Sequence, residues 1–186
     1  MLFSSMIFLW LFLPFVLVVN LVLPIRLSNF LLLAMSFIFY AWGEPIYVFL
    51  MIGTILIDYL LAILIDRNRD DYSKCKWIFI LTIILNVSIL GFFKYFGFFV
   101  NNINSIFNLN IPFEGLALPI GISFYTFQVL SYIVDVYLDK VEVQYNIINF
   151  AAYVTMFPQL VAGPIVQYQT IEEQLNTRQE SVFKFG

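Results

Sequence analysis

The sequence contains no histidine and only one cysteine, Cys75. Without an imidazole, the chain has no His metal ligand, no Ser-His pair and no imidazole general base. One thiol is too few for a zinc site built from Cys and His, and no disulfide can form within the chain. We therefore predict neither a metal site nor a catalytic residue among these 186 residues.

Charge is also scarce. Only 11% of the residues are charged and 62% are hydrophobic, whereas an average soluble domain carries about 25% charged residues to cover its surface. Most of this surface must therefore face lipid, and we expect the bilayer to be the main partner of the chain. The formal net charge of -3 is spread thinly, and the absence of a basic cluster argues against nucleic acid as a partner.

Long runs without charge predict an all-α, polytopic transmembrane protein. A helix that crosses a hydrocarbon core of ~30 Å needs about 20 largely apolar residues. The first run has no preceding basic residue and no small-residue cleavage site, and it is longer than the apolar core of a signal peptide, so we interpret it as a membrane segment. We predict about six hydrophobic segments, at residues 2–23, 28–42, 46–65, 77–99, 118–138 and 147–157. The asparagine-rich stretch 101–110 predicts a turn between the fourth and the fifth.

The basic residues predict an orientation. Four of the nine lie in the loop 66–76: Arg67, Arg69, Lys74 and Lys76. Because short loops rich in Lys and Arg stay in the cytoplasm, we predict a multi-pass protein of the cell membrane with loop 66–76 inside and the N-terminus outside. The same count of crossings places Arg26 and Lys140 inside.

A polar stripe marks the segment 118–137, which reads LPIGISFYTFQVLSYIVDVY. On a helix, one face would carry Gly121, Tyr125, Gln128, Tyr132 and Asp135. An ionised Asp at the centre of a span costs ~2.5–3.5 kcal/mol on insertion scales, so the stripe should face protein or a water-filled cavity. Two interpretations stay open: the stripe lines a substrate route, or it only holds helices together as polar residues do in membranes.

The segment 157–168, FPQLVAGPIVQY, predicts a broken helix. Pro158, Gly163 and Pro164 cannot all lie within one regular helix, because proline lacks a backbone donor and clashes with the preceding turn. Irregular backbone at membrane depth must be buried in protein or line an aqueous cavity. We therefore take Pro158, Gln159, Gly163 and Pro164 as candidates for the wall of a substrate route. The alternative is a plain interfacial loop.

Three single residues in or beside the apolar segments have structural explanations. Lys94, in the run FFKYFGFF at 92–99, is expected to extend its ammonium to the headgroups, the alternative being a pair with an internal acid. Asp58, one turn after Thr54, is expected to be structural. Cys75 is expected to be an unmodified loop thiol, with S-palmitoylation as the alternative.

Two capping boxes follow the last apolar segment. Thr170 with Glu173 and Thr177 with Glu180 each predict the start of a helix. The second helix would have barely two turns before Gly186, too few hydrogen bonds to offset nucleation. We therefore expect the domain to continue beyond this residue.

The two segments at 118–137 and 157–168 resemble the bacterial branch of the membrane-bound O-acyltransferase family, the alginate O-acetyltransferase and D-alanyl-transfer type. The runs AWGEP at 41–45, FFKY at 92–95 and VFKFG at 182–186 occur in the order that this family shows. The resemblance implies that residues 1–186 form the N-terminal part of a single membrane domain, truncated at its C-terminal end. It also implies short, broken or re-entrant segments in an incomplete fold.

The resemblance further implies transfer of an acyl group, usually acetyl, to hydroxyls of an envelope or extracellular polysaccharide. It implies an acyl donor, either acyl-CoA or an acyl-carrier protein, and no bound cofactor. The catalytic histidine of this family lies in the later half of the fold. This chain alone is therefore expected to be inactive without that half. An extracytoplasmic acyl acceptor or transferase partner is also implied. Gln167 and Leu138 stand where the family commonly has basic residues.

Two other classes of function remain. A transporter also places polar stripes and broken helices at the membrane centre, but the two halves of this sequence show no matching pair of interrupted segments. A non-catalytic membrane partner would explain the lack of histidine without any truncation.

Overall fold

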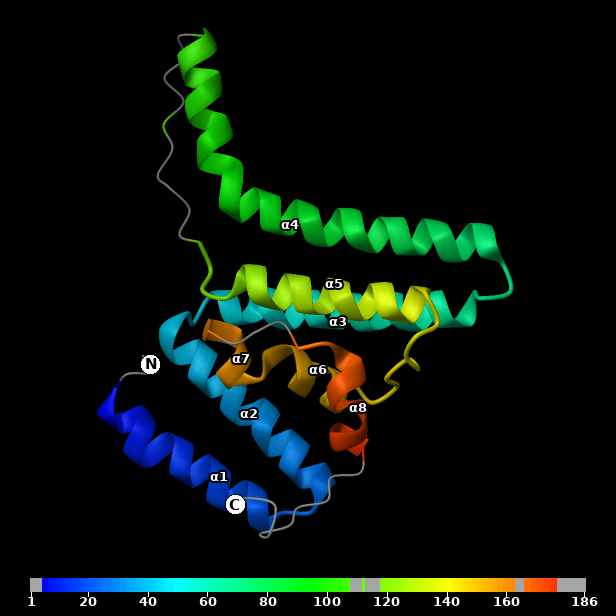
Figure 1. Ribbon diagram of the computed structural model, residues 1–186. Helices are drawn as coiled ribbons and strands as arrows, with labels where there is room; N and C mark the ends of the chain where they lie inside the picture. The colour runs from blue at the N-terminus through cyan, green and yellow to red at the C-terminus, as the bar shows by residue number, and fades with distance from the viewer. Residues whose placement is uncertain (1–4, 108–111, 113–117, 163–165, 177–186) are drawn as a thin grey trace.

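The protein is a bundle of helices, which confirms the predicted fold class (Figure 1). This computed structural model describes residues 5–107, 112, 118–162 and 166–176, and no strand occurs among them. Three helices are long and apolar enough to cross a membrane: α2 (Ile25–Gly43), α3 (Tyr47–Arg67) and α4 (Tyr72–Phe107). A shorter apolar helical stretch covers Phe8–Val22. These lengths support a location in the membrane.

The N-terminal stretch consists of a π-helical segment, η1 (Phe8–Phe12), continued by α1 (Leu13–Val22). Pro14 lies at the start of α1, where it lacks a backbone donor, and the π-helical segment lies directly before it. The aromatic rings of Phe8 and Phe12 pack on Phe39 of α2 and on Phe157, with centroids 5.4–6.0 Å apart. This small core attaches the N-terminal stretch to the rest of the bundle.

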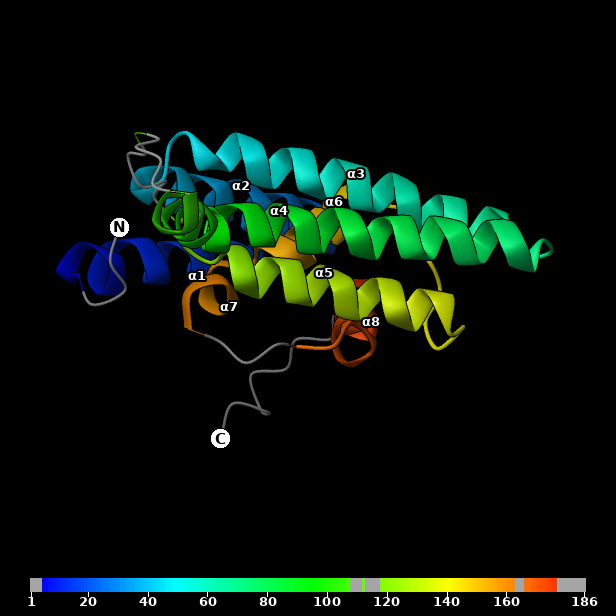
Figure 2. The same ribbon diagram turned by 90° about the horizontal axis from the view of Figure 1, so that it is seen from above.

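Helix α5 (Ile122–Tyr137) lies beside both α3 and the first part of α4 (Figures 1 and 2). The C-terminal part of α4 bends away from this layer. Figure 1 shows it turning crosswise to α3 and α5, and Figure 2, seen from above, shows it end-on. One long helix therefore has two directions, one shared with the bundle and one across it.

Two predicted loops are shorter than expected. Helix α3 extends to Arg67 and α4 begins at Tyr72, so only residues 68–71 connect them, not 66–76. Cys75 consequently lies in α4 with 7% of its surface exposed, and the interpretation as a loop thiol is wrong. The asparagine-rich stretch from 101 is also helical as far as Phe107.

The C-terminal third consists of three short helices: α6 (Ile147–Thr155), α7 (Phe157–Ala162) and α8 (Tyr168–Asn176). At ~1.5 Å per residue, α6 is only ~14 Å long, less than half of a ~30 Å hydrocarbon core. The prediction of short, broken segments is therefore confirmed here. Helix α8 begins at Tyr168, so Thr170 lies inside it and is not its N-cap as predicted; Thr177 and Glu180 lie outside the described residues.

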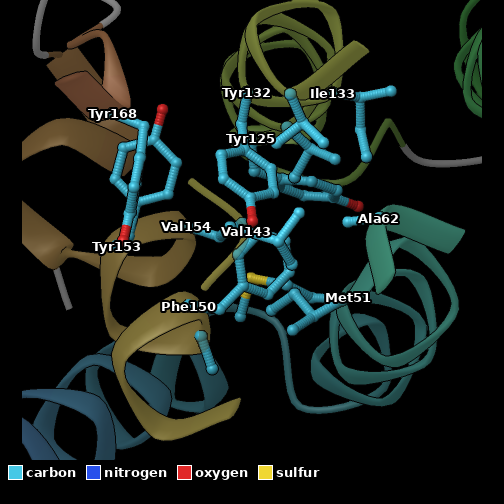
Figure 3. Packing of buried hydrophobic residues seen from close by; sticks show 14 of the residues in the cluster. Met51, Ala62, Tyr125, Tyr132, Ile133, Val143, Phe150, Tyr153, Val154 and Tyr168 are labelled. Atoms are coloured by element: carbon cyan, nitrogen blue, oxygen red, sulfur yellow. The ribbon is translucent and has the colours of Figure 1, made fainter. Parts of the chain in front are cut away.

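The main core gathers around α5. Figure 3 shows Tyr125, Tyr132 and Ile133 of α5 packed against Met51 of α3 and Phe150 of α6. Each of these five side chains is at most 2% exposed. Because α5 contacts α3, α4, α6 and α7, its inward face sits at the centre of the described fold.

A polar cluster lies between α3 and α4. Asp58 is fully buried, and its Oδ1 accepts a hydrogen bond from Asn86 Nδ2 at 2.6 Å. The same Asn86 amide donates to the carbonyl oxygen of Thr82 at 3.1 Å. This contact links the two helices across the apolar layer and supports the structural role expected for Asp58.

Arg69 ties the α3–α4 connection to the end of α5. Its guanidinium forms ion pairs with Asp66 at 2.8 Å and Asp139 at 2.7 Å, and it donates to the carbonyl oxygen of Val136 at 3.0 Å. Tyr145 donates a hydrogen bond to Asp66 at 2.5 Å, and this bond, with burial, raises the pKa of Tyr145. The connections at 68–71 and 138–146 therefore lie at the same end of the bundle, as the predicted crossing count requires.

Candidate functional site

The predicted break in the last apolar segment occurs at Met156. Helix α6 ends at Thr155, and Met156 adopts φ -49° and ψ 110°, outside the helical region. Helix α7 then starts at Phe157, which places Pro158 in its first turn. Proline is well tolerated there, because that position needs no intrahelical donor. Pro158 therefore stands at the start of a new helix, and the break lies just before it.

The amide freed by the break is satisfied by α2. In a continuous helix the Phe157 N–H would donate to the carbonyl of Tyr153, but here it donates to Ser36 Oγ at 3.3 Å. Ser36 is 1% exposed. At the other end of the same helix pair, Asn29 Nδ2 donates to Asn149 Oδ1 at 2.9 Å, and both side chains are buried. Two polar contacts thus hold α2 along α6 up to the break.

The carbonyl freed by the break is satisfied by α5. Gln128 Nε2 donates to the carbonyl oxygen of Tyr153 at 2.8 Å and to Gln159 Oε1 at 3.2 Å. Gln128 is 3% exposed. One buried amide therefore caps the end of α6 and holds the side chain of Gln159 on α7. This contact brings together the two segments that the sequence singled out.

Tyrosines surround the same place. Figure 3 shows Tyr132, Tyr153 and Tyr168 together between α5, α6 and α8, and the ring of Tyr168 lies edge-on to the other two at 4.9 and 5.2 Å. The Gln144 backbone N–H donates to the Tyr132 hydroxyl at 2.9 Å, and Gln144 Nε2 donates to the Tyr168 hydroxyl at 2.8 Å. The Tyr153 hydroxyl donates to the carbonyl of Val166 at 3.0 Å. The bonds to Val166 and Tyr168 hold the chain just after residue 165 against α6 and the 138–146 connection.

Two acidic residues, Glu172 and Glu142, lie near Tyr168. Burial raises the pKa of Tyr168 to about 12, so this phenol stays neutral and is available as a hydrogen-bond donor. Burial also raises the pKa of Glu172, and the carboxylate of Glu142 raises it further. Among the residues that the structure describes, no three His, Cys, Asp or Glu side chains come together as a metal site would require.

The predicted residues fall into three groups. Tyr125, Gln128 and Tyr132 are buried on the inward face of α5. Asp135, two turns from Gln128 on the same helix, and Gln159 on α7 are half-buried. Gly163 and Pro164 lie outside the described residues, and of Pro158 only the backbone is described.

Gly121 departs from the prediction. It does not lie on the helical stripe but precedes α5 with φ +76°, in the left-handed region. A Cβ added there would lie 2.6 Å from the carbonyl oxygen of Leu160. Gly121 therefore allows the start of α5 to approach the backbone of α7.

Sequence reasoning missed Ser36 and Asn29. They are seven residues apart, which places them on one face of α2, and both are polar within an apolar helix. The rule that singled out Gln128, that buried polar groups in a membrane segment need a partner, applies to them equally. The site is thus a helix break whose freed backbone groups are satisfied by Ser36 on one side and Gln128 on the other.

The whole chain is similar to curated O-acetyltransferases. It is 39% identical to the probable alginate O-acetylase AlgI of Pseudomonas aeruginosa and 37% identical to that of Azotobacter vinelandii, in each case over 100% of this chain but only 36% and 38% of the relative. It is 31% identical to the peptidoglycan O-acetyltransferase of Helicobacter pylori, again over the whole chain and 40% of the relative. The predicted resemblance is thereby confirmed, and the chain spans just over a third of the length of these relatives.

No protein-family model matches the chain, and no solved structure matches it significantly.

Proposed function

We propose that this chain forms the N-terminal part of a membrane-bound O-acyltransferase that transfers an acetyl group to hydroxyls of an envelope or extracellular polysaccharide. The observation that carries the proposal is the 37–39% identity to alginate O-acetylases over the full length of the chain. The reaction would need an acyl donor, acyl-CoA or an acyl-carrier protein. The rest of the fold would supply the general base, because this chain has no histidine.

In this proposal the break between α6 and α7 forms part of the wall of the substrate route. Tyr125, Gln128 and Asp135 would line it from α5, and Pro158, Gln159, Gly163 and Pro164 from the segment that follows the break. The hydrogen bond from Gln128 to Gln159 supports the juxtaposition of the two segments. Gln128 acts here as a positioning residue, since its amide is engaged by protein groups.

The test compares this chain with a longer protein that includes the coding sequence following Gly186. Both are expressed in cells that produce the polysaccharide, and ester-linked acetyl is measured by NMR. We expect acetylation only from the longer protein. Acetylation by the 186-residue chain alone would contradict the assignment of the general base to the missing part. A longer protein that moves solute across vesicles without acetylating any polymer would favour the transporter alternative.

The proposed orientation places the 68–71 connection in the cytoplasm and the N-terminus outside. Cys75 is unsuitable as a reporter because it is buried. We therefore propose Asp70→Cys in a Cys75→Ala background, since Asp70 is exposed in the connection. A membrane-impermeant maleimide should label it only after the cells are permeabilised, whereas labelling in intact cells would show the inverted orientation. Cys75→Ala alone serves as the unlabelled control.

A further inference from the structure

The C-terminal part of α4, residues 94–107, is amphipathic although it belongs to a helix that otherwise crosses the apolar layer. Lys94, Asn101 and Ser105 are spaced by seven and four residues, which places them on one face together with the exposed Phe98. The opposite face carries four apolar residues at the spacing i, i+3, i+7 and i+10: Phe96, Phe99, Ile103 and Ile106. In residues 77–93 the polar side chains are Thr82, Asn86 and Ser88, and Thr82 and Asn86 are buried toward the bundle.

The position of this segment follows from the length of α4. At ~1.5 Å per residue, the charge-free residues 77–93 that follow Lys76 extend ~26 Å, close to the ~30 Å thickness of the hydrocarbon core. Because α4 starts at the end of the bundle where Arg69 lies, Lys94 reaches the opposite face of the membrane. From there the helix turns crosswise to α3 and α5 (Figures 1 and 2), a direction that follows the membrane surface.

Most side chains of this segment are exposed, and Val100, at 8% exposed, is the buried one among residues 94–107. Phe99 is 60% exposed, Ile106 72% and Phe107 67%, and Lys94 is exposed with its ammonium 5.7 Å from the ring of Tyr95. Two polar side chains of the segment bond within the helix: Asn102 Nδ2 donates to the carbonyl of Phe98 at 2.7 Å, and Ser105 Oγ donates to that of Asn101 at 2.9 Å.

We propose that residues 94–107 lie flat in the bilayer interface, on the membrane face opposite Arg69, with the Phe96–Ile106 face in the acyl-chain boundary and Lys94 among the phosphates. An amphipathic helix with aromatic residues on its apolar face and no acidic residue binds at this depth, and aromatic side chains concentrate at the headgroup level. The occupant of the exposed apolar face is lipid. This inference does not depend on the acyltransfer activity.

Spin-label depth measurements on the 186-residue chain test the proposal. In a Cys75→Ala background, Phe99→Cys and Ile106→Cys place labels on the apolar face, and Asn101→Cys and Ser105→Cys on the polar face. All four positions are exposed, so the substitutions leave the packed core intact. The protein is reconstituted into vesicles of phosphatidylethanolamine and phosphatidylglycerol, and collision with oxygen is compared with collision with a water-soluble nickel chelate.

The labels at 99 and 106 are expected at one shared depth, ~5–10 Å into the boundary, with the labels at 101 and 105 accessible to nickel. A control label at Ile84→Cys, 57% exposed in the crossing part of α4, should lie deepest.

Three results would overturn the proposal. A depth difference of ~10 Å between 99 and 106 would mean that the helix continues across the membrane. Nickel access at all four positions would place the segment in water. Shielding of 99 and 106 from both reagents would show a protein cover, such as a second copy.

Discussion

Replacing Gly121 by alanine is expected to lower the stability of the protein by roughly 2–5 kcal/mol. The left-handed conformation of Gly121, with φ +76°, costs an L-residue about 1–2 kcal/mol. The new Cβ would also stand 2.6 Å from the carbonyl oxygen of Leu160, and such overpacking costs typically 1–3 kcal/mol. Because that atom belongs to the backbone of α7, relief requires α7 to move away from α5.

The measurement is the apparent Tm in detergent, which should fall by on the order of 10 °C. Gly53→Ala is the matched control. Gly53 lies inside α3, a Cβ there would meet nothing within 4 Å, and alanine is favoured over glycine in a helix interior by roughly 0.8–1 kcal/mol. The two substitutions should therefore shift Tm in opposite directions. Equal tolerance of both would contradict the close approach of α5 and α7.

The break in the last apolar segment shows what the sequence can predict. Three breakers between 158 and 164 were enough to exclude one regular helix, and the helix does end nearby. Its position at Met156 was not predictable, because a proline in the first turn is compatible with helix. The position of the break depends on Ser36, which is 121 residues away in the sequence and accepts a hydrogen bond from the freed backbone amide of Phe157.

The long helix α4 shows an error of the opposite kind. Asparagine is frequent in turns, and the stretch from 101 to 110 was interpreted as one. The helix nevertheless continues to Phe107, and within it the side chains of Asn102 and Ser105 bond to carbonyls one turn earlier. Local composition alone does not distinguish this arrangement from a turn.

For the polar stripe of α5, the sequence predicts one part of the arrangement correctly and another part wrongly. Its helical spacing correctly predicted one inward face for Tyr125, Gln128 and Tyr132, because each of them must avoid lipid. Residue spacing also assigns Gly121 to this face, although Gly121 precedes the helix in a left-handed conformation. The spacing does not identify the partner of each side chain, which is set by how α6 and α7 pack against α5.

Replacing Gln128 by leucine in the completed enzyme is expected to reduce polymer acetylation by about a hundredfold, as a misplacement of ~1 Å near a reaction site does, while leaving protein levels nearly unchanged. Leucine is favourable in lipid and in a packed core, so insertion should not suffer. The amide, however, donates to the Tyr153 carbonyl and to Gln159. Its loss leaves the end of α6 without a cap and frees the side chain of Gln159 on the proposed route wall.

Two further variants distinguish a positioning role of the polar stripe from a role in helix packing alone. Phe127→Leu places the same residue one position earlier, on the exposed side of α5 where Phe127 is 47% exposed, and should keep normal acetylation. Asp135→Asn removes the charge two turns along the stripe while keeping its shape, and we expect reduced transfer if the stripe lines the route. If the polar contacts of the stripe only hold helices together, each is worth on average ~0.6 kcal/mol. Acetyl transfer should then survive both Gln128→Leu and Asp135→Asn. Near-normal acetylation by Gln128→Leu and Asp135→Asn, at normal protein levels, would reduce the stripe to a packing feature and leave the segment after Met156 as the remaining candidate for the route.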